Sequence, residues 1–166
     1  MAERIVEKIV QIGMVVEDAI ETAKIYNDKY GIGPWHFCRF DENTTSGLEV
    51  NGKPCPYKII LGICTQLNVS LELIQPLDDK SIYYEFLQKH GPGVQHLAIN
   101  TFDPCDDAVK KLVDLGNEIT TQGHDETGRK FVYVDCMKDL GLVLEMYKPK
   151  TDARPKPFAY YPPRDA

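Results

Sequence analysis

The chain has 166 residues, of which 43% are hydrophobic and 27% charged, and its formal net charge is −6. This composition is typical of a globular protein with one domain, or with two small halves that share a core. The negative charge argues against nucleic acid or an anionic membrane surface as the main partner. No apolar run approaches the ~20 residues that span a bilayer, and the N-terminus lacks the apolar core of a signal peptide. We therefore expect a cytoplasmic protein that binds neither nucleic acid nor membrane.

The first half of the chain predicts the element order β-α-β-β-β. Residues 17–30 carry apolar side chains at helical spacing, and Gly31 supplies a C-terminal stop. The polar, turn-rich segment 41–54 predicts a loop or a loose hairpin. Runs rich in β-branched and aromatic residues predict strands over 8–16, 34–40, 57–64 and 68–75.

The second half repeats this order after a connecting helix at about 80–90. An amphipathic helix is predicted over 103–116, and strands over 93–101, 117–123, 130–136 and 141–147. We therefore predict one α+β domain over residues 1–166, in which two βαβββ modules are related by a pseudo-twofold repeat. Module 1 covers about 8–76 and module 2 about 93–148. The tail, 149–166, is rich in proline and aromatic residues, and we expect it to be extended and packed on the surface or on a partner chain.

Two similar segments carry a glutamate inside an apolar strand. They are "LELIQP", residues 71–76, and "LEMYKP", residues 144–149. Because strand side chains alternate between faces, the neighbouring apolar residues should pack on the helices while Glu72 and Glu145 point to the opposite face. Aligning the halves also pairs Gln11 with His96. Each lies on the same face as a small residue two positions later, Gly13 or Ala98.

These four polar residues predict a shared metal site. If the sheet curves around a cavity, Gln11, Glu72, His96 and Glu145 converge there. Two neighbouring buried carboxylates are costly unless a cation accompanies them. Each residue alone has an ordinary interpretation as a polar strand position, and it is the repeat that favours a site. One imidazole, two carboxylates and an amide oxygen suit a divalent ion such as Zn, Co, Ni, Mn or Mg.

The repeated modules resemble the vicinal oxygen chelate superfamily, which includes glyoxalase I, methylmalonyl-CoA epimerase, extradiol dioxygenases and bleomycin-resistance proteins. The segments "LELIQPLDDKSIYYEFLQKHGPGVQHLAI" and "GLVLEMYKP" are most similar to the epimerase branch. The resemblance implies metal ligands at the same four positions. Gln11 stands where the first ligand of the family is most often histidine, although animal-type glyoxalase I enzymes also use glutamine. Lys58 stands where the epimerase carries a second acid/base glutamate.

The expected chemistry is removal of a proton from carbon next to a carbonyl. A divalent cation stabilises the resulting enolate, and a glutamate beside the metal takes the proton. Glu145 is our leading base and Glu72 the alternative. Lys58 is the candidate second proton donor, which epimerisation or racemisation requires. The cavity-lining, substrate-binding residues are expected to be aromatic: Trp35, Phe37, Phe131 and Tyr133.

Several alternatives remain open at this point. The substrate is an acyl-CoA such as methylmalonyl-CoA, or a cyclic or aromatic ketone, since no Lys/Arg cluster marks a CoA phosphate site. A glyoxalase I-type lyase or isomerase would need a carboxylate site, for which Arg39 and Arg129 are the candidates. The third alternative is a non-catalytic binding protein of the bleomycin-resistance kind. We also expect a homodimer, because the tail is rich in aromatic residues.

Overall fold

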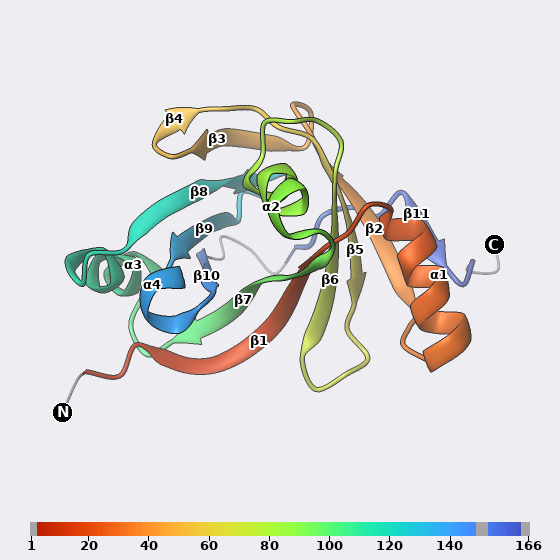
Figure 1. Cartoon of the computed structure of the whole chain (residues 1–166), viewed down its shortest axis with the longest axis horizontal. Helices are drawn as coiled ribbons and strands as arrows, with labels where there is room; N and C mark the ends of the chain where they lie inside the picture. Colours follow the sequence, from red (N-terminus) through yellow and green to blue (C-terminus); the bar gives the residue numbers. More distant parts are fainter. Residues whose placement is uncertain (1–2, 149–152, 164–166) are drawn as a thin grey trace.

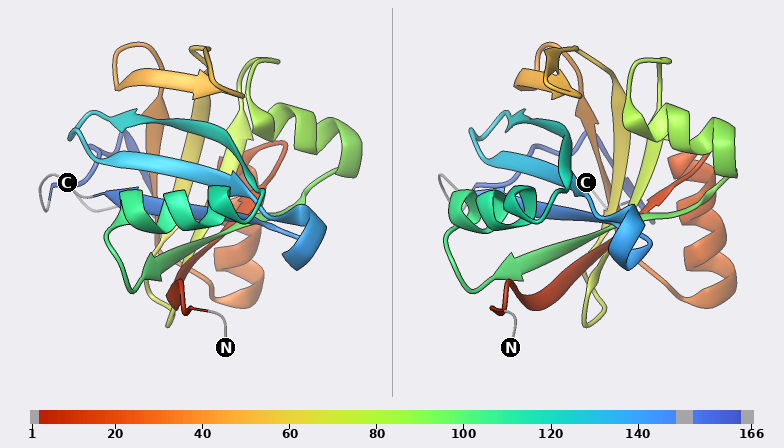
Figure 2. Two further views of the ribbon diagram at one scale, coloured as in Figure 1. Left: turned by 90° about the vertical axis from the view of Figure 1, so that its left-hand side faces the viewer. Right: turned by 60° about the vertical axis from the view of Figure 1, so that its left-hand side comes forward.

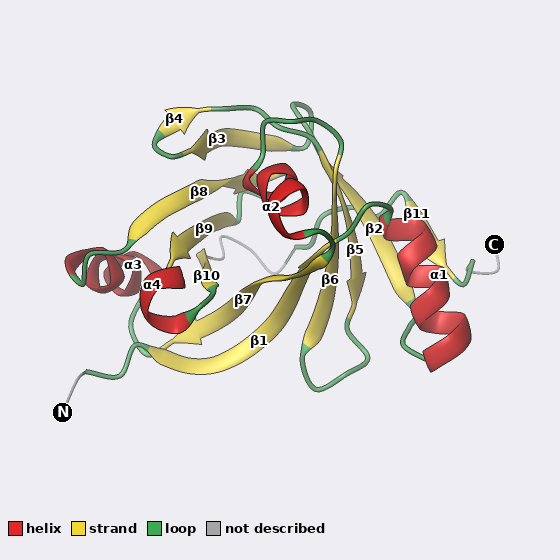
Figure 3. Cartoon of the chain, in the orientation of Figure 1, coloured by secondary structure: helices red, strands yellow, loops and turns green. Residues whose placement is uncertain are grey.

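Strands β1 (Val6–Val15) and β7 (Gly93–Thr101) lie antiparallel at the centre of an eleven-stranded mixed sheet. The computed structural model describes residues 3–148 and 153–163, so part of the predicted tail lies outside the described residues. The strand order is β11-β2-β5-β6-β1-β7-β10-β9-β8-β3-β4. The sheet is curved, with helices α1 (Ala19–Tyr30) and α3 (Cys105–Asp114) on its outer side (Figures 1 and 3).

The predicted duplication is confirmed by the arrangement of the strands. On one side of the centre the order is β2-β5-β6-β1, and on the other it is β8-β9-β10-β7. In both halves the central strand pairs in parallel with the last strand of its own module. Module 1 contains α1 (Ala19–Tyr30), β2 (Trp35–Phe40), β5 (Ile59–Cys64) and β6 (Ser70–Pro76). Module 2 contains α3 (Cys105–Asp114), β8 (Glu118–Asp125), β9 (Lys130–Asp135) and β10 (Val143–Lys148).

The connecting helix and the segment 41–54 have definite structures. Helix α2 (Ile82–His90) begins after Ser81, whose hydroxyl accepts a hydrogen bond from the Tyr84 amide at 3.2 Å. The segment predicted as a loop or loose hairpin forms β3 (Thr45–Val50) and β4 (Lys53–Pro54). Strand β3 pairs with β8 and so joins the sheet of the other module. The sequence did not predict the short helix α4 (Met137–Leu140) or strand β11 (Ala159–Tyr161).

Three apolar clusters fill the space on the two faces of the sheet. One lies between α1 and the strands of module 1, and a second between α3 and the strands of module 2. The third lies on the inner face, where residues of both modules, β3 and α2 meet. Figure 2 shows α1 and α3 on the outer sides of their modules. Within the described residues, no helix combines the length and apolar character that crossing a membrane requires.

The described part of the tail packs against its own chain. Strand β11 pairs antiparallel with β2, and the Phe158 amide donates a hydrogen bond to the Phe37 carbonyl at 2.8 Å. The Tyr161 hydroxyl donates to Asp28 at 2.8 Å, which ties the segment to α1. The expected packing on the surface is therefore found in this part, while the homodimer stays a prediction.

The prediction that Trp35 and Phe37 line the cavity is wrong. They are 0% and 1% exposed and belong to the cluster between α1 and the sheet. The Trp35 ring meets Tyr26 edge-on at 5.9 Å, and its indole N–H donates to the Ile32 carbonyl at 2.6 Å. Since side chains alternate along β2, it is His36, Cys38 and Phe40 that face the cavity.

Replacing Trp35 with Phe should therefore lower stability without affecting the cavity. We expect a loss of about 1–3 kcal/mol in the free energy of unfolding, because the smaller ring leaves a void and the Ile32 carbonyl loses its hydrogen-bond donor. Urea unfolding measures this, and zinc affinity serves as the control. Unchanged stability together with weakened ligand binding would contradict this placement of Trp35.

Candidate functional site

The register of the central strands brings Glu72 and His96 to opposite sides of Gly13. On β1, Gly13 faces Glu72 of β6 and His96 of β7. A side chain cannot be accommodated at this position, since a Cβ built on Gly13 would lie 1.8 Å from His96 Cε1. The imidazole therefore occupies the space that the glycine leaves, as the sequence suggested.

Glu72, Gly13 and His96 form one row of neighbours across the strands, and the repeat produces a second, equivalent row. Ala98 of β7 faces Gln11 of β1 on one side and Glu145 of β10 on the other. Tyr147 lies two residues beyond Glu145 on the same face. Its hydroxyl is 2.7 Å from Glu145 Oε2 and 2.9 Å from Gln11 Oε1. A hydroxyl has a single proton, so it can serve only one of these oxygens fully and leaves the other for a further partner.

Near the site, each central strand contains a bulge that interrupts the alternation of side chains. In β7 the extra residue is Gln95, between the pairs formed by Val94 and His96. Gln95 Oε1 lies 2.9 Å from His96 Nδ1, so that nitrogen carries the proton and Nε2 presents its lone pair. In β1 the extra residue is Val10, which lines the cavity together with Gln11.

The buried acid–imidazole cluster has the composition of a metal site. His96 Nε2 lies 3.1 Å from Glu145 Oε2 and 3.6 Å from Glu72 Oε2. It is buried and forms no hydrogen bond with the described residues. One ligand atom from each of these three residues lies within 4.8 Å of the others. An unpartnered imidazole nitrogen between two buried carboxylates fits a divalent cation.

The electrostatics of the cluster without a cation are unfavourable. Burial raises the pKa of Glu72 to about 7, and the charge of Glu145 contributes further, against opposing effects of His96, Arg129 and Gln11. Burial by itself lowers the pKa of His96, but the contact with Glu145 and the charge of Glu72 outweigh it and raise the pKa. Both shifts show that the site attracts positive charge, which a metal ion supplies.

The site forms part of the wall of a cavity of about 650 Å³. The predicted residues Phe131 and Tyr133 line it, together with four further rings: Phe40, Tyr57, Tyr83 and Tyr147. Arg129 and Arg154 also reach the cavity wall, whereas Arg39 is exposed and does not line the cavity. Tyr147 could have been found from the sequence, because it shares the strand face of Glu145.

The prediction that Lys58 faces the site is contradicted. Its side chain is 49% exposed and forms an ion pair with Glu42 at 2.9 Å on the surface. Alternation gives the reason, since Tyr57 and Leu61 point into the cavity and Lys58 lies between them on the other face.

Replacing Gly13 with Ala should weaken metal binding. The new methyl group would displace His96, and we expect zinc affinity to fall by about 10- to 100-fold, as when a ligand loses its proper orientation. Competition with a chromophoric chelator measures this. Gly93→Ala is the matched control, because a Cβ built on Gly93 in β7 has no atom within 4 Å. Equal zinc affinity in the two variants would refute this role of Gly13.

The metal-free protein should lose stability as the pH rises from about 5 to 8. Glu72 has a pKa of about 7 in the fold against an ordinary 4.5, so the folded state holds its proton more tightly. The raised pKa of His96 acts in the same direction. The stabilisation is therefore complete below the unfolded pKa and is lost as the pH passes through the folded one.

Urea unfolding across this range, with a chelator and with zinc, tests the expectation. Bound zinc should remove the decline, because it replaces the protons. The Glu72→Gln variant, which is uncharged at every pH, should show a smaller decline than the wild type. A metal-free protein whose wild-type and Glu72→Gln forms have the same pH profile would contradict the expectation.

Similar proteins share the fold. A methylmalonyl-CoA epimerase of Mycobacterium tuberculosis matches with a TM-score of 0.61 and 22% identity, over 91% of this chain and 93% of that one. A variant methylmalonyl-CoA epimerase of Streptomyces coelicolor, in complex with 2-nitronate-propionyl-CoA, matches with a TM-score of 0.62 and 20% identity, over 88% and 99%. At these identities the likeness concerns the fold.

Sequence comparison gives a further relative and the family. The uncharacterized protein YqjC of Bacillus subtilis (strain 168) is 32% identical over 88 residues, which are 51% of this chain and 61% of that protein. The chain thus matches less than two thirds of the length of this relative. The family model of the Glyoxalase/Bleomycin resistance protein/Dioxygenase superfamily matches residues 10–133. With a match over most of its length and the corresponding fold, the chain belongs to this superfamily.

Proposed function

We propose that the protein is a metal-dependent epimerase or racemase that removes a proton from carbon next to a carbonyl and passes through an enolate. The observation that carries the proposal is the unpartnered imidazole nitrogen of His96 between Glu72 and Glu145, two carboxylates that line a cavity large enough for a small molecule. The fold shared with methylmalonyl-CoA epimerases supports it.

In this proposal the chain supplies both the ligands and the base. Glu72, His96 and Glu145 would hold the ion, and Gln11 would contribute its amide oxygen. A divalent ion bound there would withdraw electrons from the substrate carbonyl and make the adjacent C–H more acidic. Glu145 then takes the proton, while the Tyr147 hydroxyl, 2.7 Å away, orients the carboxylate. Glu72 remains the alternative base, because the repeat makes the two carboxylates equivalent.

The second proton donor must come from a residue other than Lys58. Tyr57 and Tyr83 come from module 1 and the connecting helix, whereas Glu145 comes from module 2, and all three line the cavity. Burial is the main cause that raises the pKa of both phenols, so each keeps its proton at neutral pH. These hydroxyls are our candidates for returning a proton to the substrate carbon.

Two substrate classes follow from two observations. The acyl-CoA analogue bound by the Streptomyces coelicolor relative supports a thioester. The six aromatic rings on the cavity wall support a cyclic or aromatic ketone. The alternatives that a test must separate from the proposed epimerase or racemase are a lactoylglutathione lyase-like activity and non-catalytic binding.

Glu145→Gln should abolish proton exchange while keeping some metal affinity. The amide oxygen can still bind the ion but cannot take a proton, so exchange of the substrate α-hydrogen should fall by about 10²- to 10⁴-fold. Proton NMR in D₂O, with methylmalonyl-CoA and with a 2-substituted cyclic ketone, measures this on zinc-loaded protein.

Lys58→Met is the control and should leave the exchange unchanged, because Lys58 lies on the surface. Tight binding of both probes by the wild type without any exchange would favour the non-catalytic binding protein over our proposal.

A further inference from the structure

Arg129 is a half-buried cation on the cavity wall, and its contacts leave most of its hydrogen-bonding capacity unused. It lies just before β9, and its side chain is 18% exposed. Its Nε donates to Asp125 Oδ2 at 3.0 Å, and the Asp125 side chain is 1% exposed. Among the described residues, no other carboxylate lies within ion-pair distance of this guanidinium. A guanidinium has five N–H donors, so four remain for another partner.

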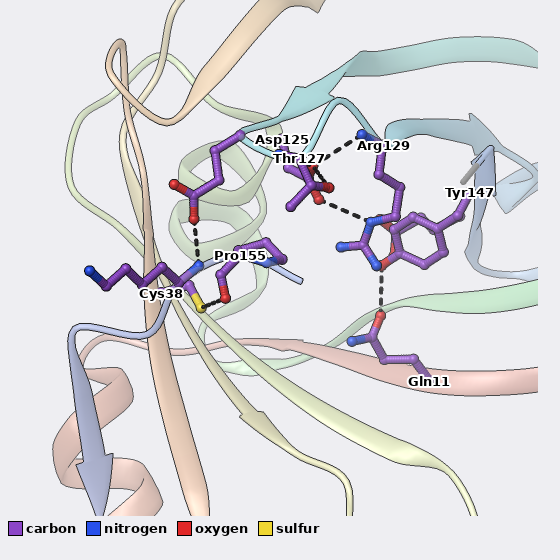
Figure 4. Close-up of polar contacts among 10 residues, drawn as sticks. Gln11, Cys38, Asp125, Thr127, Arg129, Tyr147 and Pro155 are labelled. Carbon is purple, nitrogen blue, oxygen red and sulfur yellow. Dashed lines mark hydrogen bonds and ion pairs between the residues drawn. The ribbon is translucent and has the colours of Figure 1, made fainter. Parts of the chain in front are cut away.

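Asp125 holds the arginine through a tight turn. Its Oδ1 accepts from the Thr127 amide at 2.9 Å, the Thr127 hydroxyl at 2.6 Å and the Arg129 amide at 3.1 Å (Figure 4). The carboxylate is therefore well satisfied by the turn, and it meets the guanidinium from the Nε side. This arrangement leaves the two terminal NH₂ groups, which form the fork that binds carboxylates, free of Asp125.

The ring of Tyr147 lies between the guanidinium of Arg129 and the candidate metal ligands. Its central carbon is 4.6 Å from the centroid of the Tyr147 ring, and Figure 4 shows the two side chains together. The hydroxyl of that ring contacts Gln11 and Glu145. A small molecule whose carbonyl is at the metal could thus reach Arg129 with a group a few bonds away.

The charges around the cavity also favour an anion. Glu72 and Glu145 are offset once a divalent ion is bound, and Asp125 offsets one of the two arginines on the wall, Arg129 and Arg154. The positive charge left over is that of Arg154, which is exposed, so with a divalent ion bound the cavity wall carries a net positive charge. A net positive charge on the wall attracts an anionic ligand.

We propose that Arg129 anchors a carboxylate of the substrate, so that the substrate is a carbonyl compound with a carboxylate a few bonds from the reacting carbon. This inference rests on the proposed metal-centred function and narrows its substrate class. The fork of Arg129 would bind the carboxylate in bidentate fashion and orient the α-hydrogen toward the base.

The test uses hydroxamates, which chelate the metal and need no turnover. Succinic and glutaric monohydroxamates carry a carboxylate, and butyric and valeric hydroxamates replace it with a methyl group. Calorimetry on zinc-loaded wild type should show the carboxylate forms binding about 10- to 100-fold more tightly, as expected for a charge-assisted pair. Arg129→Gln should reduce this preference to within about threefold. Arg39→Gln is the matched control and should keep the preference, because Arg39 is exposed outside the cavity.

The outcomes separate the anchor from the proposed function. Equal binding of charged and neutral hydroxamates by the wild type, or a preference that survives Arg129→Gln, would overturn the anchor even if α-proton exchange is observed. Conversely, a preference for the carboxylate forms that depends on Arg129 supports the role of Arg129 even if the protein catalyses no exchange. In that case only the proposed reaction is wrong. Zinc affinity of Arg129→Gln, measured in parallel, must match the wild type, since a loss there would point to a role in the metal site through Tyr147.

Discussion

The cost of burying Glu72 and Glu145 beside one imidazole is the constraint on which the site depends. Two carboxylates that are 4% and 2% exposed repel each other and have lost their hydration. The described residues provide hydrogen bonds around them but no fixed positive charge in direct contact. A fold that carries such a cluster gives up stability for a place suited to a cation, which is a common relation between function and stability.

The repeat brings the polar side chains together, and it requires only a few specific residues to do so. Each row across the centre needs a small residue between two larger polar ones, and Gly13 and Ala98 fill that role in equivalent positions. The two halves are not identical, because only the row with the imidazole requires a glycine. One module therefore supplies space and the other supplies the ring, so neither half holds a complete ligand set.

Alternation and repetition in the sequence were enough to predict the fold and to bring Glu72, His96 and Glu145 together. The same rule, applied within β2, would have turned Trp35 and Phe37 toward α1, but their aromatic character suggested the cavity. The bulges of β1 and β7 could not be predicted, since an extra residue in a ladder depends on the partner strand. Contacts between distant segments also determine the pairing of β3 with β8 and the position of the Arg129 side chain. Local sequence patterns do not contain this information.

The exchange of edge strands between the modules has a consequence for how the chain folds. Hairpin β3–β4, from the first half, completes the sheet beside β8, and β11, from the end of the chain, completes it beside β2. Each half therefore closes the exposed edge of the other, where unpaired strands invite aggregation. Such non-local pairings raise the contact order, so we expect slow folding and unfolding of the two halves as one cooperative unit. A single module would leave its edge strand unpaired, so we expect neither half to be stable as a separate fragment.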